Sequence, residues 1–185
     1  MEVQHINIKI FAREPAPADL AGAIPVFHRW IQQDATGELL IDVADYRHVP
    51  EGPGVMLIAH EAHYSLGPTG GRLGLLYNRR TPATGSTREK LEQAYSAALA
   101  ACRRLEQEPE FRGSLAFDEG DVEVIFNDRA LTPNTDETFE ALRGELEAFF
   151  ASRWGQGTFV LEKTGEPRER LTVRVRRSPE TALRA

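Results

Sequence analysis

An aspartate and a histidine in two neighbouring apolar segments have the residue types of an acid–base pair. Asp42 lies within the apolar run "LLIDV", where burying an unanswered carboxylate would be costly. If residues 46–54 connect two paired strands in an even register, Asp42, His60 and Tyr64 share one face. The carboxylate would then orient the imidazole as a general base, with His48 in the adjoining loop. The candidate catalytic residues of a small hydrolase- or lyase-like enzyme are therefore His60, Asp42 and His48.

The segment "HEAH" around His60 does not have the spacing of a zinc protease. That motif needs two histidines four positions apart on a helix, whereas His60 and His63 are three apart in an expected strand and point to opposite faces. An Asp–His pair in a strand can equally be a hydrogen-bonded structural feature. No GxSxG elbow supplies a nucleophile and no GxGxxG loop supplies a nucleotide site. We predict no metal and no cofactor.

Three segments repeat one pattern at the end of an expected strand: "IFAREPAP", "LYNRRTPA" and "IFNDRALTP". Each has an aliphatic residue, an aromatic residue, a small or amide residue, an arginine and a proline, which suggests an internal repeat of a strand–helix unit. One interpretation is that the pattern has a structural role alone, in which the same residues shape the same kind of turn three times. Strand ends and helix N-termini also bind carboxylates and phosphates in open sheets. The candidate ligand-binding residues are Arg13, Asn78, Arg79, Arg80, Asn127 and Arg129.

In the C-terminal segment "RERLTVRVRR" the arginines at even-numbered positions share one face of the expected strand, and Leu171, Val173 and Val175 share the other face. An arginine row on an open sheet face could bind nucleic-acid phosphates. It could equally be a solvated face or a protected edge strand, and it lacks the interleaved aromatic residues that single-stranded nucleic-acid sites prefer. Under this alternative the nucleic-acid-binding residues are Arg170, Arg174 and Arg176.

Alternation and helical spacing define the elements that position these residues. We expect the order β-α-β-β-β-α-β-β-α-β-β, with "DEGD" at 118–121 as a hairpin turn. Ser86 and Glu89 have capping-box spacing at the start of the clearest helix. The expected helices are 24–34, 86–108 and about 134–154. The expected strands are 5–11, 38–46, 54–66, 72–78, 114–117, 122–127, 158–163 and 170–177.

Strict alternation in "INIKI" and "LTVRVR" is typical of strands covered on one face only. Strand–helix–strand connections favour parallel neighbours and short turns favour antiparallel ones. We therefore predict a single α+β domain over residues 1–178, with a mixed sheet of about eight strands and three helices packed on one face. Residues 179–185 are expected to form a frayed C-terminal tail.

The composition limits the classes of function. The 185 residues are 41% hydrophobic and 27% charged, with a net charge of -6, which argues against nucleic acid as a partner. A single cysteine, Cys102, and no expected signal or membrane segment favour a soluble, cytoplasmic protein. The leading hypothesis is a non-catalytic module that self-associates as a homo-oligomer or binds a protein or small anionic ligand. The enzyme and the phosphate-backbone binder are the alternatives.

Overall fold

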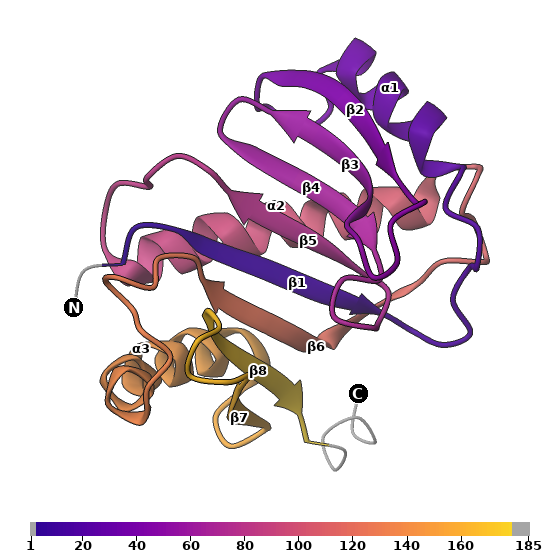
Figure 1. Ribbon diagram of the computed structural model, residues 1–185. Helices are drawn as coiled ribbons and strands as arrows, with labels where there is room; N and C mark the ends of the chain where they lie inside the picture. The colour runs from indigo at the N-terminus through magenta and orange to yellow at the C-terminus, as the bar shows by residue number, and fades with distance from the viewer. Residues whose placement is uncertain (1–2, 179–185) are drawn as a thin grey trace.

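The computed structural model describes residues 3–178, which form one eight-stranded sheet with three helices packed on one face (Figure 1). This confirms the predicted α+β architecture. Residues 179–185, for which we predict a frayed tail, lie outside the described residues. The strands are β1 (Ile6–Ala12), β2 (Leu40–Tyr46), β3 (Gly54–Ala59), β4 (Ala62–Gly67), β5 (Gly74–Arg79), β6 (Phe117–Phe126), β7 (Phe159–Thr164) and β8 (Leu171–Arg177). The helices are α1 (Ala23–Gln33), α2 (Thr87–Gln107) and α3 (Asp136–Trp154).

The strands lie in the order β2-β3-β4-β5-β1-β6-β8-β7, and every hydrogen-bonded pair is antiparallel. The parallel neighbours that we expected from the three crossovers are therefore wrong. Each crossover does join strands that run in the same direction, but other strands lie between them. β1 separates β5 from β6, and β8 separates β6 from β7. The length of a connection predicts relative direction, whereas adjacency depends on which later strand fills the gap.

One expected strand is in fact two strands, and two expected strands are in fact one. The predicted number of strands is therefore still correct. The segment 54–66 is not one strand but the hairpin β3–β4, with Ile58 opposite His63 and the turn at residues 60–61. This turn contains no Gly, Pro or Asn to signal it. Conversely, residues 118–121 do not form a turn. The β1–β6 register moves from Ile10–Val122 to Ala12–Phe117, so "DEGD" is a bulge within the continuous strand β6.

The face of the sheet that the helices cover carries the hydrophobic core. α1 packs on β2 and β3, α2 packs on β5, β1 and β6, and α3 packs on β7 (Figure 1). Alternation along β1 sends Ile6, Ile8 and Ile10 into this core, where they are 0–2% exposed. A continuous row of buried cross-strand partners crosses the sheet: Leu57, Tyr64, Tyr77, Ile8, Val124 and Val173.

Helix α2 begins as its sequence predicts. The Ser86 hydroxyl accepts a hydrogen bond from the Glu89 backbone N–H, and the Glu89 carboxylate accepts one from the Ser86 N–H at 2.7 Å. This reciprocal pair satisfies two backbone donors that the first helical turn leaves free. Cys102 is buried on the same helix. Within residues 3–178, no helix combines the length and the apolar character needed to cross a membrane.

The position of Ile8 in the middle of the core row gives a direct test of the fold. We expect Ile8→Ala to lower the free energy of unfolding by about 2–5 kcal/mol, because it leaves a cavity beneath α2. Val160 is 56% exposed on the edge strand β7, and Val160→Ala is expected to change stability by less than about 0.5 kcal/mol. Urea unfolding measures both values. Equal effects at the two positions would contradict this arrangement.

Candidate functional site

The predicted Asp42, His60 and His48 do not come together. Asp42 is exposed on the edge strand β2, so its expected burial is wrong, and its Oδ1 accepts a hydrogen bond from the Val43 N–H at 2.8 Å. His60 is exposed in the β3–β4 turn. His48 lies at the other end of the β2–β3 hairpin, roughly 20 Å away by strand rise. Tyr64 lies on the helix-covered face, opposite Asp42. The register at Asp42 is even, with Ile58 as its partner, but β3 ends at Ala59 and a bulge between Leu40 and Asp42 shifts the pairing at the end next to His60.

The antiparallel pairing of β1 divides the predicted corner residues between two ends of the sheet. Arg13 follows β1 at one end of the sheet. At the other end Asn78 and Arg79 are the last residues of β5, Arg80 follows them, and Asn127 and Arg129 follow β6. There the second and third corners flank the start of β1. The Arg79 N–H donates to Asn7 Oδ1 and the Asn127 N–H donates to the His5 carbonyl, both at 3.0 Å. The first corner therefore cannot share a ligand with the other two.

A hollow of about 810 Å³ lies on the face of the sheet that the helices leave open. We call it the open-face basin. Leu76 of β5 and Ile125 of β6 provide its apolar floor, and the chain around residues 69–70 and 164–170 borders it. Two sets of predicted residues meet here: Asn127 and Arg129 of the third corner, and Arg170 of the C-terminal arginine row. Its charged lining residues are Lys9, Glu123, Arg129, Glu169 and Arg170.

Two arginines at the edge of the basin are held in place by neutral groups. Arg170 donates from Nη1 to Asn127 Oδ1 at 3.0 Å, and Arg129 donates from Nη1 to the Arg168 carbonyl at 2.8 Å. Each bond occupies one of the five N–H donors of a guanidinium. Both arginines are exposed, and no carboxylate within residues 3–178 forms an ion pair with either. Guanidinium donors in this state suit a carboxylate or a phosphate.

Lys9 and Glu123 form the inner wall of the basin as cross-strand neighbours on β1 and β6. Lys9 is only 3% exposed, and its ammonium donates to the carbonyl oxygens of Thr69 and Arg72. Burial lowers the pKa of Lys9 to about 8, although the nearby Glu123 carboxylate opposes this shift. Burial also raises the pKa of Glu123. The lysine thereby holds the β4–β5 connection over the sheet and has one donor left for a ligand.

The predicted C-terminal arginines lie on the open face, but two of them are already paired with acids. Asp121 accepts from Arg174 at 2.8 and 2.9 Å and from Arg72 at 2.6 Å. Burial disfavours the charged form of Asp121, yet these two arginines outweigh it and lower the pKa of the carboxyl. Arg176 pairs with Glu162 at 3.1 Å. Phosphate binding along the whole row would have to compete with these ion pairs, so Arg170 is the most available of the three.

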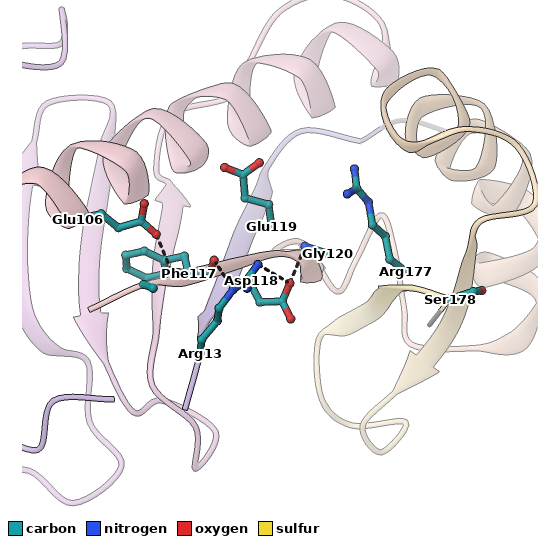
Figure 2. Close-up of a pocket in the computed structure, with 9 residues that line it drawn as sticks. Arg13, Glu106, Phe117, Asp118, Glu119, Gly120, Arg177 and Ser178 are labelled. Carbon is teal, nitrogen blue, oxygen red and sulfur yellow. Dashed lines mark hydrogen bonds and ion pairs between the residues drawn. The ribbon is translucent and has the colours of Figure 1, made fainter. Parts of the chain in front are cut away.

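The first corner residue, Arg13, lines a separate hollow of about 590 Å³ at the opposite end of β1 (Figure 2). Figure 2 shows Arg177 apart from Arg13, with Asp118 and Glu119 between them. The acids of this hollow have partners: Glu119 binds Arg103 through two hydrogen bonds, and Asp118 Oδ1 accepts from the Gly120 N–H at 3.0 Å. Since acids dominate the lining, this hollow is a weaker candidate for an anion than the open-face basin.

The edge strand β2 is the most apolar exposed part of residues 3–178. Four of the five large hydrophobic side chains that are exposed in this part of the chain lie in or beside it. A seven-residue strand at the edge of a sheet also leaves backbone groups available for another strand. An interface could therefore form along this edge. The four residues are Leu39 (68% exposed), Ile41 (54%), Tyr46 (42%) and Val49 (40%).

Sequence reasoning identified Asn127, Arg129 and Arg170 of the basin but missed Lys9 and Glu123. Both charged residues alternate with buried apolar ones, and such a pattern is normally typical of a solvent-exposed face. Nothing in the order of residues shows that the β4–β5 connection folds back over Lys9. Within residues 3–178, no group of three His, Cys, Asp or Glu side chains is arranged to hold a metal ion.

Comparison of the chain with known protein families, with curated proteins and with solved structures finds no match. The assignment of a function therefore depends on the geometry and chemistry of the residues themselves. On those grounds the open-face basin is the best candidate for a ligand site.

The buried lysine predicts a specific dependence of stability on pH. The folded-state pKa of Lys9, about 8, lies below the ordinary lysine value of 10.5, so unfolded chains bind more protons between these pH values. Stability must then rise with pH across this window. We expect the wild type to gain up to about 3 kcal/mol relative to Lys9→Met between pH 7.5 and pH 10.5. Urea unfolding of both proteins across the window measures the gain, and parallel curves would contradict the burial of a titrating Lys9.

Proposed function

We propose that this protein is a non-catalytic binding module that holds a small organic or inorganic anion, a carboxylate or a phosphate, in the open-face basin. The observation that carries the proposal is the convergence of Arg129 and Arg170 beside Asn127, with no acid paired to either arginine within residues 3–178. The buried Cys102 suits a reducing cytosol, which is the setting we propose.

The composition of the basin supports a ligand with both charge and an apolar part. The two guanidinium groups and the ammonium of Lys9 supply donors, while Leu76 and Ile125 offer an apolar surface between them. Within residues 3–178 Glu169 forms no ion pair with either arginine, and its Oε2 accepts the Glu166 N–H at 2.7 Å in the β7–β8 turn. The hydrogen bonds of Arg129 to the Arg168 carbonyl and of Arg170 to Asn127 hold the two guanidinium groups in place before a ligand arrives.

Titration with two defined anions tests the proposal. We expect inorganic phosphate or citrate to bind the wild type, and the double variant Arg129→Ala/Arg170→Ala to bind at least tenfold more weakly. The reason is that each charge-assisted hydrogen bond contributes about 1.5–3 kcal/mol. Isothermal titration calorimetry at low salt measures the affinities.

The matched control is Arg176→Ala, which removes an exposed arginine from the same open face but outside the basin. It should leave the affinity within about twofold of wild type, because distant surface charges are screened. No binding of either anion at millimolar concentration, or an equal loss in the control, would contradict the proposal.

A second candidate function is self-association through β2, and the cluster of exposed apolar residues at this edge favours it. A second copy of the chain is the partner we propose. Antiparallel pairing of two β2 strands around Val43 sets Asp42 opposite Ala44, and Asp45 opposite Ile41, of the second copy. No two carboxylates then face each other directly, whereas a shift by one residue would oppose Asp42 to Asp45. Pairing around Val43 therefore avoids repulsion between aspartates across the two-fold contact.

A single added charge should abolish this contact. We expect the wild type to have twice the mass of the 20.7 kDa chain in light scattering at high concentration, and Ile41→Lys to return to one chain. Val160→Lys makes the same change on the opposite edge strand, β7, and should leave the dimer intact. A wild type that stays at 20.7 kDa throughout rules out the β2 contact, as does dissociation by both variants.

A further inference from the structure

A third hollow lies on the helix-covered side of the sheet and contains an acid that the functions proposed above do not use. It has a volume of about 320 Å³, within the lower range of small-molecule sites, and lies between the chain after α1, strand β4 and helix α2. Ala100 of α2 lines it and is exposed, so the hollow opens to solvent beside this helix. We call it the Glu38 cavity. The polar residues used below are Glu38, Tyr64, Gln93 and Arg104.

The carboxylate of Glu38 is only half satisfied. Its Oε1 accepts a hydrogen bond from the Tyr64 hydroxyl at 3.0 Å, whereas its Oε2 is buried and has no hydrogen-bond partner among residues 3–178. A buried carboxylate oxygen without a donor is costly, and native proteins rarely leave one. Burial raises the pKa of Glu38, although the hydroxyl groups of Tyr64 and Tyr77 and the charge of the Arg79 guanidinium oppose the shift. The missing partner is thus a hydrogen-bond donor, and a positively charged donor would favour the ionised carboxylate most.

The surroundings hold Glu38 in a fixed position. Tyr64 is 2% exposed and packs edge-on against Tyr77 with ring centroids 5.2 Å apart. The Tyr77 hydroxyl in turn accepts a hydrogen bond from Gln93 Nε2 at 2.8 Å, which ties this pair to α2. Two buried tyrosines therefore fix the direction of the carboxylate from below. The free Oε2 has little freedom to find another partner within the protein.

The other residues that line the cavity limit the size and the polarity of a ligand that fits. Ala97, Ala100 and Ala101 of α2 present small apolar side chains, and they leave room for a short hydrocarbon body. The guanidinium of Arg104 stacks over the Trp30 ring at 5.4 Å and donates to Gln33 Oε1 at 2.8 Å, while its buried Nε has no hydrogen-bond partner among residues 3–178. Glu38 is the only acid among the residues that line the cavity, and the volume of about 320 Å³ excludes a large ligand.

We propose that the Glu38 cavity binds a small primary amine, whose ammonium group donates to the Glu38 carboxylate and whose apolar body packs against the alanines of α2. This site is separate from the open-face basin, since the sheet lies between them. Its test therefore does not depend on anion binding.

Matched charged and neutral probes test the proposal. We expect n-butylamine or benzylamine to bind the wild type at neutral pH and to shift amide NMR signals along residues 97–104 of α2. The neutral isostere 1-butanol should bind about tenfold more weakly or worse, as should n-butylamine to Glu38→Gln, because a charge-assisted hydrogen bond is lost. The control Glu145→Gln removes an exposed acid from α3 and should bind like the wild type.

A second variant decides the matter if Glu38→Gln does not fold. Ala97→Leu keeps the acid but fills the cavity, so it should fold, with its circular dichroism unchanged, and lose the amine. The proposal is overturned if neither amine binds the wild type, if 1-butanol binds as well as n-butylamine, or if Ala97→Leu binds them unchanged.

Discussion

The structure depends on a central strand, β1, that is buried on both of its faces. Ile8 and Ile10 enter the core beneath α2, while Lys9 is 3% exposed on the opposite side. A buried ammonium group needs hydrogen-bond acceptors, and the ammonium of Lys9 donates to the carbonyl oxygens of Thr69 and Arg72. The β4–β5 connection is therefore held over a face that would otherwise be flat. The wall of the open-face basin follows from this requirement, and so does the lowered pKa of the lysine.

The same strand determines which side chains can act together. Because β1 is antiparallel to both β5 and β6, the ends of those two strands meet beside its start, and its own end lies at the far side of the sheet. Arg13 is therefore excluded from any site that uses Arg129. Three similar corners in the sequence cannot all contribute to one ligand when the middle strand of the three runs the other way. The internal repeat that they suggest stays a prediction.

Local patterns predicted the elements well, and contacts between distant segments set the limit of prediction. The capping box at Ser86 and Glu89 is visible in the sequence because it involves only neighbouring residues. The turn after Ala59 has no Gly or Pro to mark it, and Gly120 lies in a bulge that resembles a turn signal. The site divides in the same way. A local pattern identifies Asn127 and Arg129, whereas Lys9 and Glu38 matter because of contacts with residues 26 to 63 positions away.

The arginines of the second and third corners lie on different sides of the sheet although their sequences are similar. In the second corner the arginine follows its asparagine directly, as Asn78 and Arg79; in the third corner one residue intervenes between Asn127 and Arg129. Alternate residues of a strand point to opposite faces. Arg79 accordingly turns to the helix-covered side, where it pairs with Glu61 at 3.0 Å and acts on the Glu38 carboxyl. Arg129 remains at the open-face basin. The two arginines therefore serve different sides of the sheet: Arg79 is placed by its position in β5, and Arg129 by the loop after β6, where its hydrogen bond to the Arg168 carbonyl holds it.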